Sequence, residues 1–575
     1  MRLSNKISAL ALILALPLLA ACGDSSSAEK DETGQESPLR TSLTIGMTQF
    51  PSTLHPLIDS MLAKSYVHGF TRRPITAFGH DWTVQCLLCE ALPSYADGTI
   101  KQVTRDDGTE ALDVTYTLDA RAKWGDGTPI TTKDVLFTWE VGKHPETGVS
   151  NAELFAEDIT NITVHDDRSF TLHLDKVVCN AEGINDFELI PAHIDRAAFD
   201  KGAREYRNQT AYVTDPTNPG LWSGPYRLAE QQTGAWLKLT RNTQWWGDAP
   251  QFDDITIRVI EDTTALTANL RAGDVDMIAG GLGLTADQGL AFEERHGKDW
   301  QIIWEDGLIY EHIDMNLDDP WLADQRVRKA LIHALDRDTL VEQLFKGRQK
   351  VAHANIHFLD SVYNDDVTKY GHDPVKAAEL LDQAGWSLRQ DGKRVNAKGE
   401  VLRLRFGTTA GNRSRELVQQ FLQDNWSKVG VEVEIANQTP RVFFGDTMNE
   451  RKFGHMAMYA WIAAPQNIPR TTLHSTMIPT EENNWAGQNY PGYVSDETDK
   501  ILDDLETVCE QPARQQLWDR LQVKYAEDLP VIPLYFRANP HILPKWLTGL
   551  RPTGHLDPAS LWVTEWKQRE TADKD

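Results

Sequence analysis

Two histidines, His353 and His357, have the spacing in this chain that most suggests metal chemistry. Residues four apart on a helix present their side chains on one face, as two imidazole ligands of a metal require. The surrounding residues 351–358 supply no third ligand and no helix start. The sequence therefore favours a loop with two ordinary histidines, and we predict neither a metal site nor a cofactor.

The most easily recognised catalytic motifs are missing from the sequence. It has no Gly-x-Ser-x-Gly elbow, no His-Glu-x-x-His pair and no phosphate-binding Gly-x-x-x-x-Gly-Lys-Ser/Thr loop. Residues 281–286 (GLGLTA) match a dinucleotide-binding fingerprint after the apolar stretch 275–279, but a turn between a strand and a helix explains these glycines equally well. We predict a protein that is not an enzyme, with an exported hydrolase as the less favoured alternative.

The first 21 residues have the layout of a signal peptide. Arg2 and Lys6 precede an apolar run over residues 7–21, which is too short for a comfortable membrane span. Residues 19–22 (LAAC) resemble the lipobox of bacterial lipoproteins, in which Cys22 becomes the acylated first residue of the mature chain. The alternative is an ordinary cleavage site that happens to precede a cysteine.

Beyond this leader the chain is large and acidic. We expect residues 22–39 to form a disordered tether, because residues 23–38 contain no aromatic or branched aliphatic side chain that could be buried. The net charge of −26 argues against nucleic acid as a partner. No later run of about 18 apolar residues occurs, so we expect the remainder to be soluble. Its length exceeds that of one compact core and predicts at least two lobes.

Four cysteines remain if Cys22 carries lipid. An even number in an exported chain suggests two disulfides, with three possible pairings. Cys86 and Cys89 are close enough for a local bridge, which leaves Cys179 with Cys509. A redox or zinc motif at the first two would need a thioredoxin-like context or a second ligand pair, and the sequence offers neither.

Tryptophan is the most informative residue type for ligand binding. The chain has 18, and Trp245, Trp246, Trp461 and Trp485 are among those in polar or Gly/Pro-rich surroundings. Aromatic walls suit pockets that bind by stacking and area burial. The alternative, packing of a large core, applies to most of them.

Alternating strand and helix patterns predict an α/β fold that would position these residues. Residues 43–47, 113–118 and 170–174 are the expected strands. The irregular segment 350–366 is of a kind that often serves binding.

Helix signals are clearest where caps are present. Asp373 followed by Pro374 predicts a helix start, and Gly385 predicts its end. A second helix is expected after residue 131 or 132, with Val135, Leu136 and Trp139 on its buried face.

Between about residues 40 and 560 the chain carries a series of short motifs: 123–129 (KWGDGTP), 224–228 (GPYRL), Asn316, 326–331 (RVRKAL) and 529–535 (LPVIPLY). In kind and order these motifs resemble those of the family 5 solute-binding proteins of ABC transporters, the oligopeptide-, dipeptide- and nickel-binding group.

The resemblance implies a periplasmic-binding-protein-like fold, with two α/β lobes that close on a ligand. We expect the two hinge crossings at 306–316 and 529–536. Lobe I would contain residues 40–305 and 537–575, with an additional subdomain at about 65–210. Lobe II would contain residues 306–536.

One departure from the family concerns charge. In peptide-binding members an aspartate just after a Trp-x-Ala sequence pairs with the α-amino group of the peptide. Here the matching stretch, 461–465, reads WIAAP and places Ala464 at that position. An unpaired buried ammonium is costly, so free-amino peptides become doubtful ligands.

The sequence therefore predicts a monomeric, lipid-anchored periplasmic or cell-surface receptor. It would capture a peptide or another amphipathic solute and deliver it to an ABC permease and ATPase complex; a ligand-sensing receptor without transport is the alternative. The residues expected to contact the ligand are Phe50, His68, Tyr310, Trp461, Trp485, Asn489 and Tyr535.

Overall fold

The computed structural model describes residues 40–569 apart from 59–60, 106–107, 153, 186, 440–441 and 483–486. The predicted signal peptide, lipid-bearing Cys22 and tether lie outside the described residues, as does Trp485. Within the described part, no helix is both long enough and apolar enough to cross a membrane.

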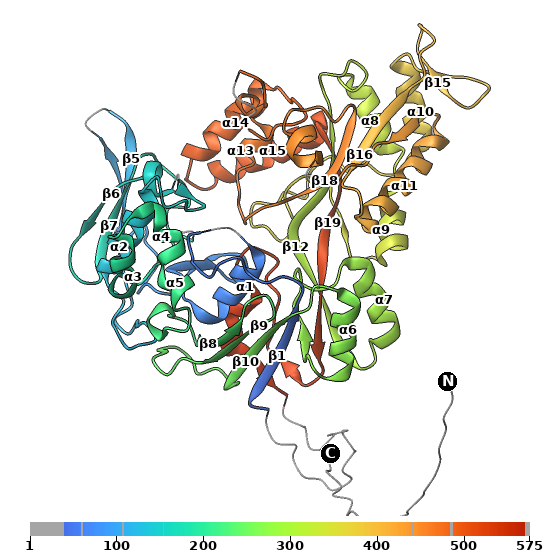
Figure 1. Cartoon of the computed structure of the whole chain (residues 1–575). Coiled ribbons are helices and arrows are strands. Elements are labelled where there is room, and N and C mark those ends of the chain that lie inside the picture. The colour runs from blue at the N-terminus through green and yellow to red at the C-terminus, as the bar shows by residue number, and fades with distance from the viewer. Residues whose placement is uncertain are drawn as a thin grey trace, which may run out of the picture. The chain divides into compact units, whose positions relative to one another are not determined.

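A mixed sheet of 11 strands organises the described chain (Figure 1). With β13 (Lys350–Val351) paired beside β19, the order is β17 (Glu432–Ile435), β16 (Arg403–Thr408), β18 (Met456–Ile462), β12 (Trp300–Met315), β19 (Val531–Pro544), β11 (Met277–Ile278), β1 (Ser42–Met47), β10 (Asp254–Val259), β9 (Trp236–Arg241) and β8 (Tyr226–Gln232). Pairing is parallel between β1 and its neighbours β10 and β11, and between β16 and its neighbours β17 and β18. It is antiparallel at the centre and at the end formed by β10, β9 and β8.

The two longest strands, β12 and β19, run through the centre of this sheet. Residues 309–315 of β12 pair with β18, whereas Ile542 of β19 pairs with β11. Their mutual register breaks between Asp306 and Tyr310. Gly307 lies in this break, where an added Cβ would be 2.9 Å from the carbonyl oxygen of Gly554. β12 and β19 therefore carry the chain between two groups of strands.

Each group of strands has its own apolar core. One core contains residues of β1, α1 (Leu62–Thr71), β5 (Glu110–Thr117) and β8 to β10, together with Leu547 and Trp566 near the C-terminus. The other contains residues of β12, β16, β18 and β19 packed against four helices, α8 (Gln325–His333), α9 (Arg337–Phe345), α10 (Pro374–Gln383) and α11 (Arg413–Lys428). The predicted lobe boundaries remain predictions.

Helices pack on this framework and confirm several sequence signals. The cap at Asp373 is as predicted, with its carboxylate accepting from the N–H of Lys376 at 2.9 Å and with Gly385 in the left-handed region. The helices are α1 (Leu62–Thr71), α2 (Thr132–Lys143), α3 (Ala192–Phe199), α4 (Ala203–Gln209), α5 (Ala211–Thr214), α6 (Thr263–Ala272), α7 (Ala286–His296), α8 (Gln325–His333), α9 (Arg337–Phe345), α10 (Pro374–Gln383), α11 (Arg413–Lys428), α13 (Arg470–Leu473), α14 (Asp496–Thr507) and α15 (Ala513–Asp528).

The predicted buried face of α2 is partly wrong. Val135 is fully buried, but Leu136 is exposed, and the buried face continues through Phe137, Thr138 and Val141. Successive helical residues turn by about 100°, so a face centred on Val135 and Thr138 directs Leu136 outward.

A separate antiparallel sheet lies beside α2 (Figure 1). Its order is β4 (Ile100–Thr104), β5 (Glu110–Thr117), β7 (Ser169–Leu174) and β6 (Ile159–Val164). Two-stranded ladders complete the described strands: β2 (Thr76–Phe78) with β3 (Val84–Cys86), β14 (Ser387–Leu388) with β15 (Arg394–Val395), and β20 (Leu547–Thr548) with β21 (Lys567–Gln568).

The cysteines lie in the pairs that the sequence favours. The sulfur atoms of Cys86 and Cys89 are 2.09 Å apart, and those of Cys179 and Cys509 are 2.15 Å apart. The second pair joins the segment after β7 to the segment after α14 across 330 residues of sequence.

Candidate functional site

A cavity of about 120 Å³ lies against the C-terminal half of β12. Strand pairing places Tyr310 of β12 opposite Trp461 of β18 and Phe536 of β19, and all three side chains line the cavity. The loop after β13 supplies Asn355, His357 and further residues to the same wall. The irregular segment predicted to serve binding is therefore part of this site.

Aromatic contacts fix the shape of the cavity. The ring of Tyr310 stacks on His312 at 5.1 Å between centroids and lies 5.3 Å from Phe536. Its hydroxyl is 3.0 Å from that of Tyr525. Burial, together with the Tyr525 hydroxyl, raises the pKa of Tyr310 well above its usual value, so this phenol stays neutral.

Trp461 forms the outer part of the aromatic wall. It stacks on Tyr490 with centroids 6.1 Å apart and is only partly buried. The next residue of the strand, Ile462, is 72% exposed and also lines the cavity. Apolar surface is thus presented at the edge of the site rather than packed in a core.

His357 brings an unused hydrogen-bond donor into the cavity. Its Nδ1 accepts from the N–H of Leu359 at 3.1 Å, so the neutral ring carries its hydrogen on Nε2. That atom is buried and has no hydrogen-bond partner among the described residues. Burial lowers the pKa of His357 to about 4, which keeps the ring neutral at pH 7.

Two further polar atoms in the cavity lack a partner within the described chain. They are Oδ1 of Asn355 and Nε2 of His312. His312 Nε2 lies 3.3 Å from Oδ1 of Asp314, but the geometry is not that of a hydrogen bond. Buried polar groups are nearly always satisfied in folded proteins, so such a concentration indicates a place for a ligand or water.

Two carboxylates line the cavity, and they accept hydrogen bonds from different kinds of donor. Asp314 accepts from the hydroxyl of Tyr459 at 2.5 Å. Asp360 is 6% exposed and accepts from the backbone N–H of Gln466 at 2.8 Å and of Val362 at 3.3 Å. Burial raises the pKa of Asp360, and these backbone donors oppose the rise.

The predicted ligand residues divide between this cavity and other places. Tyr310 and Trp461 line the cavity, and so does Ala464, the residue at the position of the family's aspartate. Tyr535, a residue of β19, lies in the core and contacts Phe345. Phe50 packs against the other core. The predicted role of each residue in binding remains a prediction.

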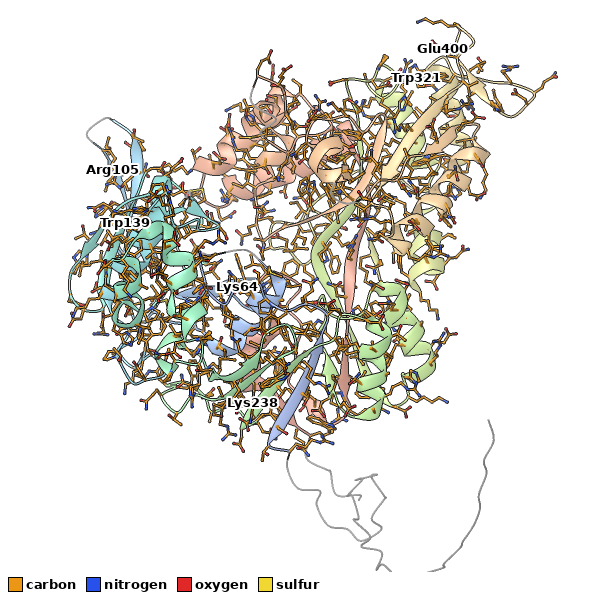
Figure 2. All side chains as sticks on the ribbon, viewed as in Figure 1. Lys64, Arg105, Trp139, Lys238, Trp321 and Glu400 are labelled. Atoms are coloured by element: carbon orange, nitrogen blue, oxygen red, sulfur yellow. A yellow bond between two sulfur atoms is a disulfide. The ribbon has the colours of Figure 1, made fainter. Side chains whose placement is uncertain are left out.

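Asn489 and His68 are held by backbone contacts. The amide of Asn489 is fully buried, donates to the carbonyls of Leu473, His474 and Tyr493, and accepts from the N–H of Tyr493. His68 contacts the carbonyl oxygen of Leu54, and together with Lys64 it lines a second cavity. Lys64 belongs to α1 (Figure 2).

The motifs set aside at the sequence level have structural places. His353 and His357 lie on a loop rather than a helix, and the described residues contain no group of three or more His, Cys, Asp or Glu side chains arranged to hold a metal. The glycines at 281 and 283 form the turn between β11 and α7. Among cavity residues, sequence reasoning missed Asn355 and Asp360, which no motif identifies.

Comparison with known proteins supports a binding role. The family model described as "Bacterial extracellular solute-binding proteins, family 5 Middle" matches residues 97–478, most of the chain. The oligopeptide-binding protein AppA of Bacillus subtilis is 24% identical over 94% of both chains. The oligopeptide-binding protein OppA of Mycobacterium bovis is 28% identical over 65% of this chain and 61% of its own.

Solved structures agree on the fold. The oligopeptide-binding protein of Thermus thermophilus, crystallised with a pentapeptide, is 28% identical and superposes with a TM-score of 0.68 over 92% of this chain and 96% of its own. NikA of Brucella suis with Fe(III)-EDTA is 19% identical, with a TM-score of 0.74 over 92% and 100%. The predicted periplasmic-binding-protein-like α/β fold is thereby confirmed.

Proposed function

Because the chain belongs to the bacterial extracellular solute-binding proteins of family 5, substrate-binding components of ABC transporters, we propose that it holds its solute in the cavity beside β12. The observation that carries this proposal is the convergence of an aromatic wall with the unpartnered polar atoms of His357 and Asn355. Aromatic area supplies affinity, and fixed polar atoms orient the ligand.

Closure of two lobes would complete the site. We place the hinge in β12 and β19, where the register breaks at Asp306 to Tyr310 beside the cavity. His357 already contacts Trp82 of the proposed lobe I at 5.2 Å between ring centroids. A ligand that touches both lobes favours the closed state by its differential affinity.

The solute class is a peptide-like or other amphipathic compound. Relatives named as oligopeptide-binding proteins and a structure solved with a pentapeptide support it. A cavity of this size takes only part of a larger ligand, since an engineered cavity of about 150 Å³ holds a benzene ring. The proposal includes no catalysis, and a ligand-sensing role without transport is the alternative that gene neighbourhood would test.

The proposed setting is a monomer held at a membrane outside the cytoplasm. Cleavage before Cys22 and its acylation would anchor the chain through residues 22–39, close to the permease. In that oxidising compartment both close cysteine pairs would be disulfides.

Ligand-induced stabilisation tests the function. The mature chain with Cys22→Ser would be screened by thermal shift against di- to pentapeptides, amines, oligosaccharides and nickel chelates, because a ligand that binds only the folded state raises its melting temperature. Trp461→Ala should abolish the shift. Trp321→Ala is the matched control, since Trp321 (Figure 2) packs on Trp386 and His455 outside the cavity lining. Equal loss in both variants, or no shift with any compound, would contradict the proposal.

A further inference from the structure

We propose that Asp360 binds a positively charged group of the solute, so that the protein selects ligands carrying an ammonium or guanidinium group. This inference rests on the proposed function and names the ligand chemistry of the same cavity. The carboxylate comes from the loop after β13 and not from the segment in which the family carries its aspartate.

The charges around the cavity have one sign. Asp314 and Asp360 both line it, and none of the described lining residues is lysine or arginine. Of the two histidines in its wall, His357 is held neutral by burial and supplies no positive charge. An anionic group entering this space would meet carboxylates without a counter-charge, whereas a cation would be compensated.

Asp360 is the carboxylate that remains open to a ligand. Asp314 already accepts a hydrogen bond from Tyr459 and adjoins His312. Asp360 makes no ion pair with a described residue, and only backbone N–H groups bind it. An ionised carboxylate has about four lone-pair sites, so acceptor capacity remains on a side chain that is 94% buried. A buried charge in this state is stabilised strongly by a cationic partner.

Asp360 supplies a negative charge close to Ala464, the position at which the family carries its aspartate. Its Oδ2 is 2.8 Å from the N–H of Gln466, two residues beyond Ala464, and both Asp360 and Ala464 line the cavity. The negative charge is thus supplied at nearly the same wall from another element. The small side chain of Ala464 leaves the space in front of it open to the ligand.

The remaining polar atoms define the rest of the ligand. Nε2 of His357 needs an acceptor, and Oδ1 of Asn355 needs a donor. An amide beside the cationic group offers both, and an apolar group would lie against Trp461 and Phe536. A short peptide with a free amino terminus and a neutral carboxyl end has all these groups.

Three probes with one skeleton test the charge requirement. They are the tripeptide Ala-Phe-Ala as its C-terminal amide, the same amide acetylated at its amino group, and the acetylated free acid. Calorimetry on the mature Cys22→Ser chain should find the free-amino amide bound about 10- to 100-fold more tightly than the acetylated amide, the range expected for one hydrogen bond to a charged group. The free acid should bind most weakly.

Asp360→Asn should reduce this preference for the free amine to about one, and Asp366→Asn should preserve it. Asp366 lies on the same loop with an exposed side chain and lies outside the cavity lining, so its variant controls for the change in net charge. Because the readout is a ratio within one variant, a general loss of stability does not imitate it, and unliganded melting curves show that each variant folds.

The outcomes separate the inference from the proposed function. A preference that survives Asp360→Asn, equal binding of all three probes, or strongest binding of the acid overturns the role of Asp360 while the binding function stands. Absence of binding for these probes and for every compound of the wider screen overturns both.

Discussion

Glu311 of β12 offers a sharp test of how the central strands are held. Its side chain is fully buried and lies between two guanidinium groups, with Arg415 Nε 2.7 Å from one carboxylate oxygen and Arg537 against the other. Burial alone would raise the pKa of Glu311, but Arg537 and Arg415 bring it below its usual value. Glu311→Gln removes the charge and leaves both arginines uncompensated.

The expected loss is about 3 to 5 kcal/mol of unfolding free energy, the range for removing one member of a buried ion pair. Glu432→Gln is the matched control, because Glu432 also contacts two cations, Lys393 at 2.5 Å and Arg403 at 2.8 Å, but does so at the surface. Such exposed pairs contribute about 0 to 1 kcal/mol.

Urea unfolding followed by circular dichroism measures both variants. Because the folded-state pKa of Glu311 is depressed, its contribution is present above the unfolded pKa of about 4.3 and is lost as the pH falls through the lower folded value. The difference between the wild-type protein and Glu311→Gln should therefore shrink below about pH 4.3. Equal losses in the two variants at pH 7, or a difference that grows on acidification, would refute this reasoning.

Three other predictions concern stability and location. Replacing Cys179 and Cys509 by serine should lower the unfolding free energy by up to about 6 kcal/mol, the loop-closure value for a pair that closes a loop of 330 residues. A melting temperature equal to that of the oxidised protein would contradict this. Asn489→Ala should lower the unfolding free energy by about 2 to 3 kcal/mol in urea unfolding, because it removes buried hydrogen bonds. If the role of Asn489 is structural, calorimetry should find the ligand affinity changed less than threefold. Cys22→Ser should move the protein from the membrane to the soluble fraction of fractionated cells, and unchanged partitioning would argue against the lipid anchor.

Local signals predicted local structure well. The cap at Asp373 and the stop at Gly385 depend on hydrogen bonds and backbone angles within a few residues, so the sequence contains the whole cause. The outward direction of Leu136 was not predictable in the same way, because the buried face of α2 is chosen by the segments that pack on it.

Only part of the site was predictable from the sequence, because distant segments of the chain meet there. Tyr310 and Trp461 were expected from family resemblance, and strand pairing brings them together. Asp360 lies in the irregular segment 350–366, but no motif distinguishes it among 84 acidic residues, and in the folded chain it contacts Gln466, 106 residues away. The pairing of Cys179 with Cys509 was favoured by elimination alone, and the folded chain brings the two together.

The covalent bond that Cys179 and Cys509 are placed to form has a mechanical consequence. In the proposed function, the two adjacent strands β12 and β19 would form the hinge axis about which one lobe turns relative to the other. A bond between the segments after β7 and after α14 is a third attachment, outside that axis. Three attachments that are not collinear fix a body, so with this bond closed the angle of opening is limited to the slack in the two attached segments.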